Sequence, residues 1–240
     1  MLFRSNLGLS IAAGQTTVTL SAQQDTYTNG TSGNESTAYG TAVELYMFSQ
    51  TNNVDYTKAA LYQFDLTGIT ASSVVSATLR IFCTNEQTTK AGECRVFGMN
   101  DAWAEATATY LTTDGATLWG SGSGANVIAS FDATPTAAQE NICPNDAAGL
   151  RANPNYVSGN WPNSDWAGGF VEFDVSSLVE NWLGIGTPRD NYGLAVVTTG
   201  RIVKPATADP LFDNLYGWVE SRWASKENTT ASRRPQLVIV

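Results

Sequence analysis

The side chains with which this chain could do chemistry are mainly carboxylates and tryptophans, because its 240 residues include no histidine. The lack of an imidazole excludes Ser–His–Asp and Cys–His nucleophiles and His-ligated zinc. No glycine-rich loop follows an expected strand, which argues against phosphate or nucleotide chemistry. What remains is cation binding by oxygen ligands, stacking on sugar rings and carboxylate catalysis.

Paired carboxylates can hydrolyse glycosidic bonds without a histidine. Asp65, Glu105, Glu172 and Asp174 lie on expected strands. A carboxylate-based glycan hydrolase or lyase is therefore a minor alternative. The main expectation is a protein that is not an enzyme and has no catalytic residues.

Three aspartates, Asp25, Asp132 and Asp174, are weak candidates for a metal site. Calcium takes carboxylate and carbonyl oxygens from loops. No dense D-x-D-x-D loop is present, so solvated or turn-capping aspartates are the ordinary alternative. We expect no cofactor, except that one structural calcium is compatible with these residues.

Seven tryptophans bear on sugar binding. An aromatic ring stacks on a sugar when it is exposed on a loop or on a concave sheet. Trp119, Trp161 and Trp166 lie in the polar segment 112–169 and are the candidates for glycan stacking, although burial against the protein is equally compatible with that position. The other tryptophans are expected in the core or in a sheet.

Cys83 and Cys94 end and begin two neighbouring strand-like runs. A hairpin between those runs would bring the two sulfurs together, which makes this pair a candidate disulfide. The alternative is two small apolar residues in a hairpin, and the odd count of three cysteines weakens a disulfide framework.

The charge of the chain limits its partners. The net charge is −9, with only 13 basic residues. Nucleic acid and anionic membrane surfaces both need a positive footprint, so neither is an expected partner. No apolar run is long enough to cross a membrane.

These side chains must be positioned by many short strands. The clearest unit is 170–199, in which residues 170–175 alternate apolar and polar, Ser177 and Glu180 have the spacing of a capping box that would open a short helix, and residues 192–197 form a second, buried strand. The other expected strands are residues 43–48, 59–66, 74–83, 94–99, 102–110, 127–131, 216–223 and 236–240. A helical turn is expected near residues 136–141.

Short strands, frequent turn signals and little helical periodicity predict an all-β antiparallel sandwich with long loops and one or two short helical turns. The apolar end at residues 237–240 predicts that the last strand is central, since an exposed apolar edge promotes aggregation. Residues 1–22 read as an N-terminal arm, and residues 23–240 as a single domain.

Several short motifs, in order, are similar to one family. They include Asp25-Thr26-Tyr27, Trp103-Ala104-Glu105, Phe173-Asp174-Val175, Asn191-Tyr192-Gly193-Leu194 and Arg234-Pro235-Gln236-Leu237. The region 24–240 resembles the disaggregatase-related (DNRLRE-type) domain family, which includes alginate-binding carbohydrate modules. The resemblance implies a jelly-roll β-sandwich used as a non-catalytic surface module. It also implies structural roles for Trp103, Glu105, Asp174 and Arg234. A structural role for Arg234 would pair it with a carboxylate such as Glu105 or Asp174, and ligand binding is the alternative.

Two functions follow as expectations. The first is a structural surface protein of an extracellular assembly, a virion decoration or fibre or a filament subunit, that displays a carbohydrate-binding jelly roll and docks to other subunits through residues 1–22. This rests on the additional arm and on the lack of a secretory leader before Met1. The alternative is a soluble secreted polysaccharide-binding module. Both place the protein outside the cell or on a virion surface.

Overall fold

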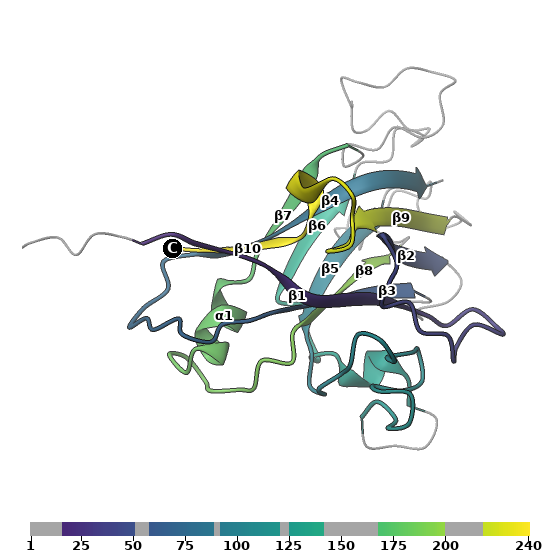
Figure 1. Cartoon of the computed structure of the whole chain (residues 1–240), viewed down its shortest axis with the longest axis horizontal. Helices are drawn as coiled ribbons and strands as arrows, with labels where there is room; N and C mark the ends of the chain where they lie inside the picture. Colours follow the sequence, from purple (N-terminus) through teal and green to yellow (C-terminus); the bar gives the residue numbers. More distant parts are fainter. Residues whose placement is uncertain (1–15, 51–57, 89–91, 121–124, 142–167, 200–217) are drawn as a thin grey trace, which may run out of the picture.

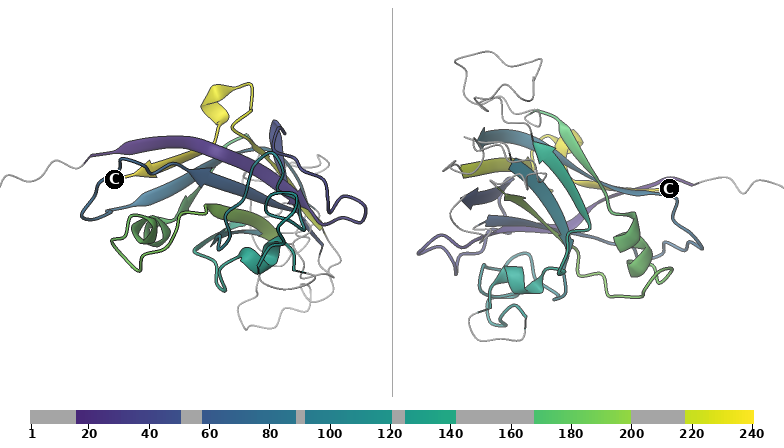
Figure 2. Two further views of the ribbon diagram at one scale, coloured as in Figure 1. Left: turned by 60° about the horizontal axis from the view of Figure 1, so that its bottom comes forward. Right: turned by 180° about the vertical axis from the view of Figure 1, so that it is seen from behind.

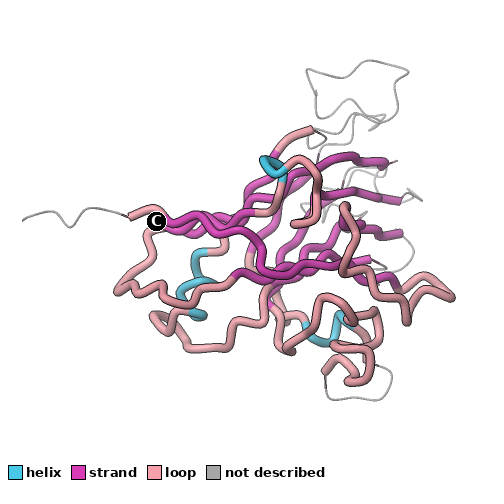
Figure 3. Tube along the Cα trace, viewed as in Figure 1, coloured by secondary structure: helices cyan, strands magenta, loops and turns pink. Residues whose placement is uncertain are grey.

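The computed structural model describes residues 16–50, 58–88, 92–120, 125–141, 168–199 and 218–240. Within these residues the regular structure is mainly strand, joined by loops, with three short helical segments (Figure 3). Among them there is no helix with the length and apolar character needed to span a membrane.

Ten strands follow one another along the described chain: β1 (Val18–Asn29), β2 (Glu44–Gln50), β3 (Lys58–Phe64), β4 (Ala77–Thr88), β5 (Gly92–Gly98), β6 (Ala137–Asn141), β7 (Phe170–Asp174), β8 (Leu194–Thr199), β9 (Trp218–Ala224) and β10 (Gln236–Ile239). The helical segments are the 3₁₀ turns η1 (Val127–Ser130) and η2 (Ala231–Arg233) and the helix α1 (Ser176–Trp182). Figure 1 shows the strands stacked into a sandwich, with α1 at one end.

Two long strands connect the sheets of this sandwich. The first residues of β1, Val18–Ser21, pair with β10, and the strand then shifts register near Ala22 and Gln24 and pairs with β3. In the same way β4 pairs with β10 and β7 along its first half and with β9 along its second. All the pairings are antiparallel. Figure 2 shows β1 running along the length of the sandwich.

The main core lies between the sheets and follows the alternation of the strands. On β4 the inward residues Ala77, Leu79, Ile81 and Cys83 are fully buried, and on β3 Tyr62 and Phe64 are as well. These faces are the ones that the period-two pattern predicts. The all-β sandwich is confirmed, while the jelly-roll connectivity stays a prediction.

A second core covers the outer face of β3, β5 and β8. Leu61 of β3 and Ala195 and Val197 of β8 pack under Trp119 and Val127 of the segment 99–131. This segment, with η1, lies below β3 in the view of Figure 1. Because β3 and β8 are covered on both faces, most of their side chains are apolar, which explains the continuous apolar run at residues 194–197.

The expected strands at residues 43–48, 59–66, 74–83, 94–99, 170–175, 192–197, 216–223 and 236–240 correspond to β2, β3, β4, β5, β7, β8, β9 and β10. The last strand is central, as predicted, because β10 lies between β1 and β4. The described part of the predicted arm begins with β1, so residues 18–22 belong to a sandwich strand. Residues 1–15 lie outside the described residues.

Four local predictions are wrong. Residues 102–110 form turns, although their apolar and polar residues alternate as in a strand. They pack over the second core and pair with no strand of the described sheets. Residues 127–130 form the 3₁₀ turn η1, and residues 137–141 form the strand β6. The helix α1 begins at Ser176, and its N-cap, Val175, makes no side-chain capping bond, so Ser177 and Glu180 do not form a capping box.

The predicted disulfide is also wrong. Cys83 and Cys94 are both buried thiols, and the structure holds no bond between them. The strands β4 and β5 are consecutive but do not form a hairpin, since β4 pairs with β7, β9 and β10 while β5 pairs with β6 and β8. The two cysteines act as small apolar residues of the main core.

Candidate functional site

A pocket of about 500 Å³ opens at the end of β3, beside the C-terminal end of α1. Its lining residues come from β1, from β3 and the loop after it, from α1 and from the loop before β8: Gln23, Gln63, Phe64, Asp65, Leu66, Thr67, Ile69, Trp182, Leu183 and Asn191. Its volume falls within the range of pockets that bind small ligands.

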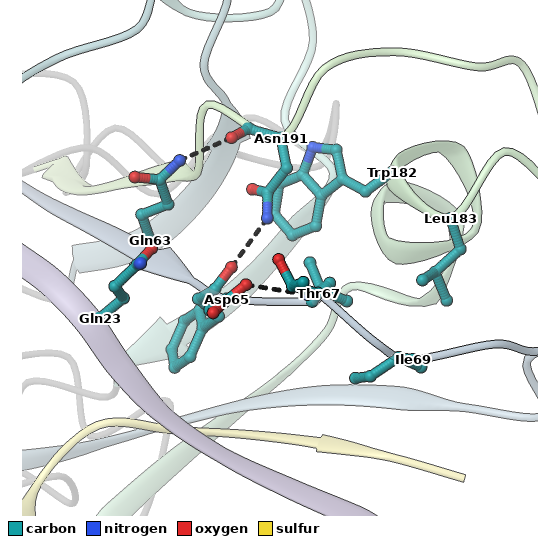
Figure 4. Close-up of a pocket in the computed structure, with 10 residues that line it drawn as sticks. Gln23, Gln63, Asp65, Thr67, Ile69, Trp182, Leu183 and Asn191 are labelled. Atoms are coloured by element: carbon teal, nitrogen blue, oxygen red, sulfur yellow. Dashed lines mark hydrogen bonds between the residues drawn. The ribbon is translucent and has the colours of Figure 1, made fainter.

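Hydrogen bonds hold the polar rim of this pocket in place. The Asn191 side chain donates from Nδ2 to the carbonyl of Phe64 at 2.8 Å and accepts from the amide of Gly193 at 3.1 Å. Gln63 Nε2 donates to the carbonyl of Asn191 at 2.6 Å. The loop before β8 is therefore tied directly to the end of β3, as Figure 4 shows.

Trp182 provides the aromatic part of the pocket. It is the last residue of α1 and extends from that helix toward Asn191 (Figure 4). Its ring is half-buried against the main core, and its Nε1 finds no acceptor among the described residues. This N–H is closed to solvent, so a ligand in the pocket would meet the exposed part of the indole ring and not the N–H.

The exposed polar residues of the pocket are Gln23, Asp65 and Thr67. Asp65 accepts a hydrogen bond from the amide of Thr67 at 2.8 Å, and the bonds from Thr67 lower the pKa of this carboxyl. The carboxylate is therefore ionised near neutral pH and can accept hydrogen bonds from hydroxyls. An indole, amides and a carboxylate around one cavity are typical of sites that bind sugars.

A separate group of carboxylates lies where three distant segments meet. Asp25 of β1, Glu105 of the segment 99–131 and Glu227 of the loop after β9 bring carboxylate oxygens within 4.8 Å of one another. Lys226 lies beside them, with its Nζ 3.0 Å from Glu105 Oε1 and 2.5 Å from Glu227 Oε1. Burial, with repulsion from the other two carboxylates, raises the pKa of Asp25 to about 8.

Among the predicted glycan-stacking residues, Trp119 is fully buried, so that prediction is wrong for this residue. Its Nε1 donates to the carbonyl of Thr109 at 2.9 Å, and its ring packs in the second core. The segment 99–131 is polar in sequence because its other side faces solvent, and this composition conceals a core tryptophan. Trp161 and Trp166 lie outside the described residues.

The three predicted metal ligands do not come together. Asp132 forms an ion pair with Arg189 at 2.7 Å, and Asp174 accepts hydrogen bonds from the amide and hydroxyl of Ser176. Asp25 has Glu105 and Glu227 as its neighbours instead. Glu227 is a residue that the sequence analysis did not consider as a ligand.

The motif residues occupy structural positions. Trp103 is buried, and its Nε1 donates to the carbonyl of Tyr192 at 2.9 Å. Glu105 pairs with Lys226, and Arg234 is exposed and donates from Nε to the carbonyl of Asn228, so the predicted pairing of Arg234 with Glu105 or Asp174 is wrong. The loop after β9 presents Lys226, and not Arg234, to Glu105.

Sequence reasoning placed Trp182 in the core or in a sheet; its ring does pack against the main core, but the sequence analysis did not consider that it also lines a pocket. The available signals were its position just before Gly184 and Gly186, where a helix ends at the surface, and the nearby motif Asn191-Tyr192-Gly193.

Comparison with protein families gives one match. The family described as carbohydrate-binding module family 96 matches residues 16–138, about half of the chain. The matched region runs from β1 to β6 and contains most of the pocket rim, Asp25 and Glu105. No curated protein matches the chain.

Proposed function

The chain belongs to carbohydrate-binding module family 96, and we propose that it binds a polysaccharide in the pocket beside Trp182. The observation that carries this proposal is the combination, in one pocket, of a half-exposed indole ring and exposed polar groups that suit sugar hydroxyls. The DNRLRE-type family that the motifs resemble also includes carbohydrate-binding modules.

The lining of the pocket favours a neutral glycan. Its ten lining residues include one carboxylate, Asp65, and neither lysine nor arginine. A uronate would therefore meet a negative charge without a cation to offset it. The hydroxyls of a neutral sugar can instead donate to Asp65, and its apolar face can pack on the exposed part of the Trp182 ring.

Binding is tested with the purified chain on a panel of soluble neutral and acidic polysaccharides, by affinity electrophoresis and then calorimetry. Trp182→Phe keeps a smaller aromatic ring against the core and removes the rest of the indole surface. Asp65→Asn keeps the shape and removes the charge. Each is expected to weaken binding about 5- to 10-fold, through lost ring contact in the first variant and through a weakened hydrogen bond in the second.

The matched control is Asp114→Asn. Asp114 is also an exposed turn-capping aspartate, which accepts from the amides of Ala116 and Thr117, but it lies outside the pocket. It is expected to bind like the parent protein. No binding across the panel, or binding that all three variants leave unchanged, would contradict the proposal. Binding confined to acidic polysaccharides would contradict the neutral-glycan specificity.

We expect binding without turnover, because the family is one of binding modules. The panel therefore includes a measurement of reducing ends and of unsaturated products over a day. Release of either by the parent protein, abolished in a carboxylate variant, would favour the hydrolase or lyase alternative.

The second candidate function is a surface subunit of an extracellular virion or filament that displays this module. The observation that favours it is the first part of β1. Within the described residues Val18–Ser21 pairs only with β10, so its other edge is open to an added strand from a second subunit. Light scattering compares the full chain with a chain that lacks residues 1–22. Because that truncation also removes the first part of β1, a second truncated chain lacks residues 1–15 only. Assembly lost in both truncated chains supports docking by the N-terminal segment; a monomer in all three forms opposes it.

A further inference from the structure

The carboxylates of Asp25, Glu105 and Glu227 form a group that glycan binding does not explain. Asp25 and Glu105 are 80 residues apart in the chain, and Asp25 and Lys226 are 201 residues apart. Carboxylates repel each other when they are ionised and buried together. A fold that brings three of them within 4.8 Å therefore requires a compensating positive charge or a shared proton.

Lys226 compensates only part of this charge. Its Nζ forms ion pairs with Glu105 and Glu227, and within the described residues it forms none with Asp25. Asp25 Oδ2 accepts from the backbone amide of Lys226 at 2.7 Å, and the backbone amide of Asp25 donates to Glu105 Oε1 at 3.0 Å. With the three carboxylates ionised, one lysine leaves a net charge of about −2, which one divalent cation would cancel.

Two oxygens of the group lack a donor. Asp25 Oδ1 and Glu227 Oε2 are buried, and no described N–H or O–H donates to either. Asp25 as a whole is 1% exposed. Buried carboxylate oxygens are normally satisfied by hydrogen bonds or by a metal ion, so these two atoms point to a ligand between them.

We propose that Asp25, Glu105 and Glu227 hold one calcium ion. The donors are all oxygens, which excludes a preference for zinc or other metals that favour nitrogen and sulfur. Calcium–oxygen distances of 2.3–2.6 Å place ligands on opposite sides of the ion about 4.8 Å apart, in agreement with the spread of these carboxylates.

The exposure of the site and the segments that it joins both fit a calcium ion. The side chains of Glu105 and Glu227 are about a quarter exposed, so an ion and its remaining water ligands can reach the site. The ion would join β1, the segment 99–131 and the loop after β9. Its role would be to stabilise the sandwich, independently of the sugar pocket.

The test uses the full chain after removal of divalent cations with a chelator, and follows calcium binding by calorimetry and the midpoint of thermal unfolding at pH 8. A calcium concentration of about 100 times the Kd is expected to raise the Tm by about 5–10 °C. Magnesium at the same concentration is expected to raise it less, because Mg²⁺ needs a tighter octahedral site.

Asp25→Asn and Glu227→Gln remove one charged ligand each without changing side-chain shape. Each is expected to weaken calcium binding at least about tenfold, whereas Asp114→Asn, at an exposed aspartate outside the group, retains it. Asp25→Asn is expected to fold at least as stably as the calcium-free parent, since it removes a buried charge. No calcium binding by the parent, or binding unchanged in both ligand variants, would overturn the proposal and leave a shared proton as the compensating charge.

Discussion

Arg189 donates from Nη1 to Asp132 Oδ2 at 2.7 Å, and this bond joins the loop before β8 to the segment that covers the second core. The same guanidinium donates from Nη2 to the carbonyl of Met99 at 2.7 Å and to Asn100 Oδ1 at 3.1 Å. One side chain thus fixes both ends of the segment 99–131, which covers the second core. The pair is about three-quarters buried, which limits its screening by solvent.

Arg189→Lys is expected to lower the free energy of unfolding by about 1–3 kcal/mol. Lysine keeps the charge, but its single ammonium cannot make the forked contacts to Asp132 and Met99 at once. Urea denaturation measures the change. Glu172→Gln serves as the control, because the Glu172 ion pair with Arg80 is more exposed and is expected to contribute less than about 1 kcal/mol. Equal effects of the two variants would contradict this prediction.

Trp119→Ala is expected to destabilise the protein by about 3–5 kcal/mol, since it empties the largest side-chain position of the second core. Trp119→Phe is expected to cost less, because it keeps a ring and loses the bond to the Thr109 carbonyl. Chemical denaturation gives both values. Glycan affinity of the Phe variant should equal that of the parent, and a selective loss of affinity would show that Trp119 reaches the sugar.

Gly193→Ala is expected to destabilise the protein more than Gly68→Ala. Both glycines have φ of +82°, so alanine costs about 1–2 kcal/mol of backbone strain at either position. A Cβ at Gly193 would additionally meet the carbonyl of Tyr62 closely, whereas a Cβ at Gly68 meets nothing within 4 Å. The difference between the two variants in the free energy of unfolding is expected to be about 1–3 kcal/mol. It measures how closely the residue before β8 packs against β3. Similar losses would mean that the backbone shifts to relieve the contact.

The free energy of unfolding is expected to depend on pH through the protonation of Asp25. Burial raises its pKa from 3.8 to about 8, with Glu105 and Glu227 adding to the rise and the hydrogen bond from the Lys226 amide opposing it. Tyr62 lies opposite Asp25 in the β1–β3 pair and is uncharged over this range. In calcium-free protein the folded state therefore holds a proton that the unfolded chain releases above its ordinary pKa. The corresponding stability is complete below about pH 4 and is lost as the pH rises toward 8.

The difference between the parent and Asp25→Asn isolates this effect from other titrating groups. Between pH 5 and pH 8, in chelator, the parent is expected to lose about 2–4 kcal/mol relative to the variant. Urea midpoints at several pH values provide the measurement. Parallel pH profiles for the two proteins would mean that Asp25 keeps an ordinary pKa in the folded state.

Much of the sandwich was predictable because a strand's alternation records which face is buried. Ala77, Leu79, Ile81 and Cys83 alternate on β4, and all are fully buried. The apolar run at the end of the chain predicted the central position of β10, since such a strand needs neighbours on both edges. The missing histidines excluded whole classes of catalysis regardless of the fold.

The alternation of apolar and polar residues alone did not distinguish a strand from a loop that packs over a sheet. Residues 102–110 have the pattern of a strand, but they turn over the outer face of β3 and β8, where packing against Leu61 and Ala195 decides their conformation. The same tertiary contact buries Trp119 and separates it from the surface. Local sequence carries no record of which distant sheet a loop will cover.

What the sequence by itself determined is the class of the protein: an all-β sandwich without imidazole chemistry, with the inward face of most strands already set by their composition. Only the tertiary structure decided which strands pair and which distant side chains meet. Cys83 and Cys94 do not meet in a hairpin, because β4 and β5 pair with different strands. Asp25, Glu105 and Glu227 meet because non-local pairing brings three segments to one point, and neither their spacing nor their neighbours in the chain encode that encounter.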